Sequence, residues 1–223
     1  MSDISLAAFS LGLICAGCLP ASPASLEGPP PGFVRLQEVA PDIVQDMRYA
    51  GSNNFTGRPV PGYAAPRCWL RKEVAQALAR VQKEAAAEGL TLVVYDCYRP
   101  QRATKAFAAW AADEADQAMK PAYYPHVEKR ALFELGYISK TSAHSTGTAV
   151  DLGFANRDFG TPFDLFDEAS ATLYAGISDE AKANRAKLLA LMEKHGFENP
   201  PNEWWHFSLK GVKDATPQDF EVR

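Results

Sequence analysis

The sequence predicts an α+β domain in which helices flank a mainly antiparallel central sheet. Predicted strands and helices follow one another without the regular rhythm of a doubly wound parallel sheet, which favours this class. The chain has 223 residues, of which 47% are hydrophobic and 11% aromatic. That is enough apolar material for one substantial core. We therefore expect a single domain over residues 36–223, preceded by a proline-rich linker at residues 26–35.

The first 25 residues differ in composition from the rest of the chain. Residues 4–19 are almost wholly apolar, but a helix that spans a bilayer needs about 20 such residues. An export signal fits better, so we expect residues 1–25 to be a signal peptide and the mature protein to be periplasmic. Asp3, with no Lys or Arg nearby, is untypical of a signal. The alternatives are a lipoprotein leader cleaved before Cys18 and a disordered cytoplasmic tail.

The first half of the domain reads as loops and strands followed by a helix and a buried strand. Short apolar runs alternate with Gly, Pro and Asn over residues 33–63, which predicts strands and ordered loops. Apolar residues recur at helical spacing in Leu70–Glu88, and Gly89 follows as a candidate helix end. Residues 90–95 are β-branched and aromatic, which predicts a buried strand.

The second half predicts two further strands among three helices. Residues 101–119 are rich in alanine, and Val127–Leu135 is a candidate short helix. Residues 148–154 read as a buried strand. Asp179–His195 is amphipathic, with a serine before it and a glycine after it. Glu203–Leu209 follows an Asn-Pro-Pro-Asn turn and reads as a third strand.

The charge balance argues against two classes of partner. The chain carries 23 basic and 27 acidic side chains, a formal net charge of -4. It has no Lys/Arg-rich block, so we expect no binding to nucleic acid or to an anionic membrane surface. A small, polar substrate is compatible with this balance.

The predicted domain contains two cysteines, Cys68 and Cys97. One precedes a predicted helix and the other follows the next predicted strand. In an oxidising compartment such a pair suggests a disulfide. The alternative is a pair of buried free thiols.

Two of the four histidines lie beside carboxylates in apolar surroundings. His144 precedes a Ser-Thr-Gly turn, and Asp151 lies in the apolar strand after it, where a carboxylate is costly unless it is paired or binds a cation. Glu203 and His206 lie in a second apolar, aromatic segment. A lone histidine in a strand is more often a core residue, and either motif alone is weak. Together, two imidazoles and one carboxylate form the ligand set of a catalytic zinc site, which leaves Glu203 as a general base.

These two motifs resemble a known metal-binding signature. Ser142-x-His144-x-x-Gly147-x-Ala149-x-Asp151, followed by Glu203-x-x-His206, is similar to that of the D-alanyl-D-alanine dipeptidases of the vancomycin-resistance type, a branch of the zinc D,D-peptidases. The resemblance runs from about residue 36 to the C-terminus, through Asn-Phe-Thr-Gly, Tyr-Arg-Pro and Thr-Pro-Phe-Asp segments. It implies hydrolysis of D-alanyl-D-alanine, one Zn²⁺ per chain bound by His144, Asp151 and His206, and Glu203 as the catalytic base.

The resemblance also implies roles for four further residues. Arg99 is expected to stabilise the transition state, Asp164 to accept the substrate ammonium with help from Tyr49, and Ser142 to contact the substrate. Each has an alternative: Arg99 as a structural partner of Asp96, Asp164 as a cap, Tyr49 as core and Ser142 as a turn former. His126 and His195 are not expected to take part.

Two other functions stay open. A zinc D,D-carboxypeptidase that trims longer peptidoglycan stem peptides would use the same metal chemistry. A non-catalytic zinc or cell-wall binding module would keep the metal ligands but would not need a base such as Glu203.

Overall fold

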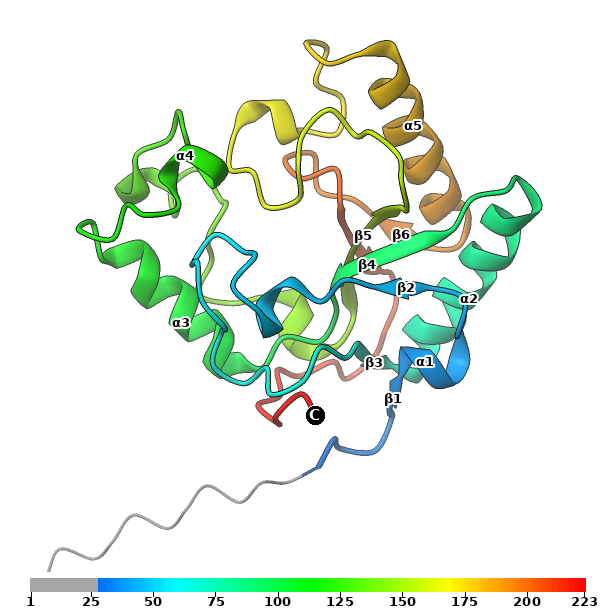
Figure 1. Ribbon diagram of the computed structural model, residues 1–223. Coiled ribbons are helices and arrows are strands. Elements are labelled where there is room, and N and C mark those ends of the chain that lie inside the picture. The colour runs from blue at the N-terminus through cyan, green and yellow to red at the C-terminus, as the bar shows by residue number, and fades with distance from the viewer. Residues whose placement is uncertain (1–27) are drawn as a thin grey trace, which may run out of the picture.

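A five-stranded mixed sheet lies at the centre of the computed structural model, which describes residues 28–223 (Figure 1). Its strands lie in the order β2-β4-β5-β7-β6. Their bounds are Val44–Gln45 (β2), Leu92–Asp96 (β4), Ala149–Phe154 (β5), His206–Leu209 (β7) and Phe197–Glu198 (β6). The β2–β4 pair is parallel and the other pairs are antiparallel. The predicted α+β class with a mainly antiparallel sheet is therefore confirmed, with one parallel pair at an edge.

A second, two-stranded sheet packs beside the first. Strand β1 (Phe33–Arg35) pairs antiparallel with β3 (Trp69–Arg71). The Phe33 ring meets the rings of Tyr98 and Phe220 edge-on, with centroids 5.3 and 5.1 Å apart. These contacts hold the end of the segment predicted as a linker, so the folded domain begins a few residues before residue 36. The signal peptide expected at residues 1–25 lies outside the described residues.

The helices surround the central sheet. They are α1 (Leu36–Val39), α2 (Lys72–Ala87), α3 (Gln101–Ala112), α4 (Lys120–Tyr123) and α5 (Asp179–Lys194). The long helices α2 and α5 contact each other on one side, and α3 lies on the opposite side (Figure 1). Among the helices of residues 28–223, none is both long enough and apolar enough to cross a membrane.

Four predicted elements are confirmed to within about two residues at each end. They are the helices at 70–88 and 179–195 and the strands at 90–95 and 148–154.

The helix predicted at 101–119 is too long. It ends at Ala112 because the Asp113 carboxylate accepts the N–H of Ala115, and the buried Lys129 ammonium binds the carbonyls of Asp113 and Asp116, each at 2.8 Å. These contacts use backbone groups that a longer helix would pair internally.

Two other predicted elements are shorter in the structure. The helix predicted at 127–135 is a single 3₁₀ turn, Lys129–Ala131. The strand predicted at 203–209 begins only at His206. Glu203 lies in the turn before it, where its carbonyl accepts a hydrogen bond from the Asn199 side chain at 2.8 Å.

Candidate metal centre and active site

Three adjacent strands place a polar residue at the same level of the central sheet. Asp151 on β5 is the register partner of both Asp96 on β4 and His206 on β7. Directly opposed residues project from the same face of a sheet, and the irregular pairing of β4 just before Asp96 adjusts its direction locally. The register therefore brings Asp151 and His206 together although 55 positions separate them.

His144 reaches the same point from a 3₁₀ helix, Ala143–Thr146. The Ser142 hydroxyl caps this helix by accepting the His144 N–H at 3.2 Å. Gly147 ends it with a φ of 76°, in the left-handed region. A Cβ atom at Gly147 would lie 2.3 Å from the Phe33 ring, so only glycine fits this turn. The turn brings His144 back to β5, where its Nε2 lies 3.1 Å from Asp151 Oδ1.

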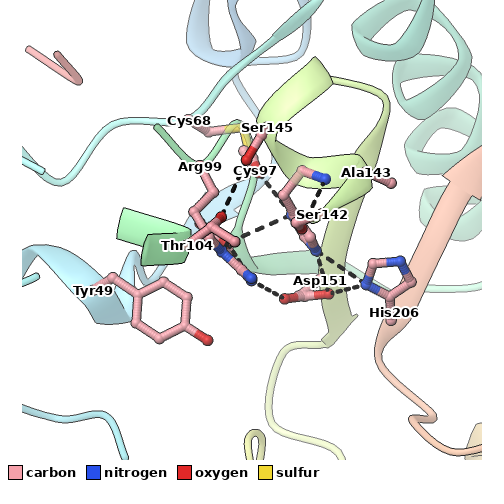
Figure 2. Close-up of polar contacts among 12 residues, drawn as sticks. Tyr49, Cys68, Cys97, Arg99, Thr104, Ser142, Ala143, Ser145, Asp151 and His206 are labelled. Carbon is pink, nitrogen blue, oxygen red and sulfur yellow. Dashed lines mark hydrogen bonds and ion pairs between the residues drawn. A yellow bond between two sulfur atoms is a disulfide. The ribbon is translucent and has the colours of Figure 1, made fainter. Parts of the chain in front are cut away.

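The three candidate ligand atoms form a compact group (Figure 2). His144 Nε2 lies 3.1 Å from Asp151 Oδ1, His206 Nδ1 lies 3.0 Å from the same oxygen, and the two ring nitrogens are 3.0 Å apart. His144 and Asp151 are buried. Burial acts to raise the pKa of Asp151, but the two imidazoles hold it below its ordinary value in the metal-free protein.

The donor chemistry of this group fits a divalent cation. His144 Nδ1 lies 2.7 Å from the Cys97 carbonyl oxygen, which can only accept, so Nδ1 carries a proton and donates it. In neutral His144 the lone pair is then on Nε2, which faces the Asp151 oxygen, another acceptor. Two acceptors this close need a proton or a cation between them. The orientation of one ring nitrogen by a backbone carbonyl is typical of a metal-binding histidine.

Glu203 lines the same cavity as the three candidate ligands but is not one of them. Burial is the largest influence on its carboxyl and raises its pKa to about 7 in the metal-free protein. A carboxyl with such a pKa can both accept and return a proton near neutral pH.

Arg99 is held by a buried carboxylate. Its Nε lies 2.9 Å from Asp96 Oδ2. Its Nη2 lies 3.7 Å from Asp151 Oδ2 (Figure 2). Burial opposes the charge of Arg99, yet the Asp96 carboxylate and its neighbours raise the guanidinium pKa well above its ordinary value. Asp96 also accepts a hydrogen bond from the Tyr63 hydroxyl at 2.7 Å. Arg99 is therefore both a structural partner of Asp96 and a residue that lines the cavity.

Asp164 and Tyr49 form a second polar pair in the cavity. The Tyr49 hydroxyl lies 3.0 Å from each carboxylate oxygen of Asp164. Burial, followed by the nearby charge of Asp151, raises the pKa of Asp164 well above its usual range. The backbone of Asp164 is left-handed, with a φ of 65°, a conformation that only a few non-glycine residues adopt. Asp164 is thus a desolvated carboxyl group whose charged form has no cation among its hydrogen-bond partners.

One cavity of about 220 Å³ unites the predicted residues. It is smaller than the roughly 300–1,000 Å³ of sites for drug-sized ligands, which favours a small substrate. Eight of the residues singled out in the sequence line it: Tyr49, Arg99, Ser142, His144, Asp151, Asp164, Glu203 and His206.

Sequence reasoning missed two residues that support this site. The sequence predicts Asp96 only as a partner of Arg99, although a carboxylate ending a buried strand signals a buried polar network. Tyr63 gave no signal at all. The other two histidines lie elsewhere, His126 paired with Asp167 at 2.7 Å and His195 paired with Glu84 at 3.0 Å.

The two cysteines of the domain are bonded to each other. The Cys68–Cys97 disulfide has an S–S distance of 2.03 Å and joins Cα atoms 5.3 Å apart. Both residues of the disulfide, which Figure 2 shows as a yellow bond, are buried. The Cys97 carbonyl is the acceptor that orients His144.

Comparisons with known proteins cover most of the chain. A family model, Peptidase_M15, described as D-ala-D-ala dipeptidase, matches residues 30–222. A D-alanyl-D-alanine dipeptidase of Enterococcus faecium is 37% identical, over 80% of this chain and 92% of the relative. One of Enterococcus faecalis is 39% identical, over 80% of this chain and 91% of the relative. The solved structure of the LD-carboxypeptidase LdcB matches 85% of this chain and 73% of its own, with a TM-score of 0.46 and 20% identity.

Proposed function

Because the chain belongs to the Peptidase_M15 family of D-Ala-D-Ala dipeptidases, we propose that its cavity hydrolyses the dipeptide D-alanyl-D-alanine to two molecules of D-alanine. The observation that carries this proposal is the meeting of His144, Asp151 and His206 in one cavity with Glu203. A binding module would need the three ligands but not a buried carboxyl whose pKa lies near 7.

His144, Asp151 and His206 would hold one Zn²⁺, the ion that suits two imidazoles and one carboxylate in a catalytic site. When bound, zinc supplies Lewis-acid polarisation of a carbonyl and a lowered pKa for water. Glu203 accepts a proton from the attacking water and returns it to the leaving amine. Arg99, steadied by Asp96, donates hydrogen bonds to the oxygen on which negative charge develops.

Asp164 would bind the free ammonium of the substrate. Its carboxylate is buried, and the neutral Tyr49 hydroxyl can donate to only one of its oxygens at a time. A substrate ammonium would supply the missing positive charge, and burial strengthens such a pair once it forms. Ser142 lines the same cavity and is the further candidate for a substrate contact. Recognition of the free ammonium favours a dipeptide over a longer stem peptide.

The cellular setting is a separate proposal. The apolar run at residues 4–19 and the small residues after it support export as a signal peptide, to the periplasm. A D-Ala-D-Ala substrate points to the metabolism of peptidoglycan precursors or fragments. Sequencing of the mature amino terminus from cells tests export, and an intact Met1 would contradict it.

Three substrates distinguish the candidate functions in an assay of the zinc-loaded protein. We expect rapid hydrolysis of free D-Ala-D-Ala, and much slower hydrolysis of N-acetyl-D-Ala-D-Ala, because acetylation removes the ammonium. L-Ala-L-Ala serves as the stereochemical control. A strong preference for the acetylated peptide would favour the carboxypeptidase, and zinc binding without hydrolysis of any of the three would favour a binding module.

A further inference from the structure

The Cys68–Cys97 disulfide lies directly behind a candidate metal ligand. Cys97 follows the last residue of β4, and its carbonyl oxygen accepts the Nδ1–H of His144 at 2.7 Å. The residue that forms the disulfide is therefore the residue that orients the imidazole. We propose that the disulfide is a positioning element of the metal centre, which raises zinc affinity by fixing the Cys97 carbonyl against His144. This inference rests on the metal centre proposed above.

The backbone around Cys97 explains why a covalent constraint matters there. Residues 97–100 connect β4 to α3 and lie outside the sheet. The Tyr98 N–H donates to the Trp69 carbonyl at 2.8 Å, and the Arg99 N–H donates to the His144 carbonyl at 3.2 Å. The disulfide adds the one covalent bond between this connection and residue 68, just before β3. Cys68 is itself held by backbone contacts, with its carbonyl accepting the Leu36 N–H at 3.0 Å.

Both half-cystines are shielded from solvent, Cys68 being 1% and Cys97 0% exposed. The disulfide is thus an internal constraint of the folded protein and not a surface crosslink. A purely stabilising disulfide acts on the unfolded chain and would leave the zinc affinity of the folded protein unchanged. A positioning disulfide changes that affinity. Loss of groups that orient metal ligands typically weakens metal binding about 10- to 100-fold.

The test compares the zinc affinity of folded full-length proteins by competition with a chromophoric chelator. We expect the Cys68→Ala/Cys97→Ala protein to bind zinc at least about tenfold more weakly than the oxidised wild type. Leu188→Ala is the matched control, because it removes buried side-chain volume in α5, does not line the cavity, and should lower thermal stability without changing zinc affinity. Long-range ¹H–¹⁵N spectra of the metal-free proteins should show the Nδ1–H form of His144 only in the wild type and in the control.

A disulfide-free protein that binds zinc within about twofold of the wild type would overturn the proposal. A wild type that does not bind zinc would instead refute the metal centre itself. If the alanine pair fails to fold, the wild type provides a reciprocal measurement, because zinc must make the disulfide harder to reduce by the same factor. Alkylation of Cys68 and Cys97 is then measured after equilibration in a thiol–disulfide buffer, with and without buffered zinc. Equal fractions reduced would also overturn the proposal.

Discussion

Tyr49 and Asp164, 115 positions apart in the chain, meet so that the Tyr49 hydroxyl lies 3.0 Å from both oxygens of the Asp164 carboxylate. The hydroxyl can satisfy only part of the hydrogen-bonding capacity of the carboxylate and none of its charge. A cationic group that enters the cavity would therefore favour the ionised form of Asp164, whose pKa burial raises in the empty site.

Replacement of Asp164 by Asn should weaken recognition of the substrate ammonium. Hydrogen bonds to charged groups contribute about 1.5–3 kcal/mol, so we expect kcat/KM for D-Ala-D-Ala to fall about 10- to 150-fold, mainly through KM. Tyr49→Phe is the control and should cost less, because a neutral hydrogen bond contributes about 0.5–1.5 kcal/mol. Steady-state kinetics decide the matter, and an unchanged kcat/KM in Asp164→Asn would assign that residue a structural role.

Glu203→Gln should separate metal binding from catalysis. The variant keeps all three candidate ligands, so we expect it to bind one zinc per chain with about wild-type affinity. Loss of a general base should lower kcat about 10²- to 10⁴-fold. Metal analysis and single-turnover kinetics on the same preparation measure the two effects. Full activity in this variant would show that another group moves the proton.

The same substitution should stabilise the metal-free protein in a pH-dependent way. Burial raises the pKa of Glu203 from 4.5 to about 7, so between these values the folded state binds more protons than the unfolded state. The wild type therefore loses stability as pH rises through this window. We expect Glu203→Gln to be more stable than the wild type by about 3 kcal/mol at pH 8, and the difference to shrink at pH 4. Urea unfolding in the presence of a chelator measures it, and a difference independent of pH would contradict the shift.

Arg99→Lys should impair catalysis without weakening metal binding. Lysine keeps a positive charge for the buried Asp96 but cannot reproduce the forked geometry of the guanidinium. We expect kcat to fall about 10²- to 10³-fold, the typical effect of removing a group that stabilises an oxyanion. Zinc affinity should not fall, since Arg99 is itself a cation 3.7 Å from Asp151. A loss of zinc affinity equal to the loss of kcat would place Arg99 in the metal-binding framework instead.

Zinc should stabilise the folded protein, and acid should abolish the effect. Binding at a free zinc concentration of 100 times Kd adds about 2.7 kcal/mol. His144 and His206 must be deprotonated to bind metal. Burial is the largest single influence on His206 and lowers its pKa, but the hydrogen bond to Asp151 together with the charges of Asp151 and Glu203 outweighs burial, so the pKa of His206 is raised in the metal-free protein. The affinity therefore falls as pH decreases through that raised pKa. Thermal melts with and without zinc at pH 8 and pH 5 measure this, with His206→Ala as the control that should not respond.

The parts of this architecture that sequence predicted well depend on short-range patterns. Helix α2 and strand β5 follow from apolar periodicity and flanking residues, and the four residues of the two metal motifs follow from unusual chemistry in apolar runs. Helix α3 is shorter than the helix predicted at 101–119. Lys129, from further along the chain, binds the carbonyls that follow the helix, and local sequence does not reveal this contact. Tyr63 could not be found from sequence because its role depends on a contact with Asp96 across 33 positions.

The direct pairing of Asp151 with His206 would couple metal binding to the alignment of β5 and β7. Side chains alternate between faces along a strand, so a slip of one position between β5 and β7 would turn one of the two donors to the wrong side. Only the correctly aligned strands can then chelate the ion. Zinc would thereby favour one register of β5 and β7 over the alternatives during folding.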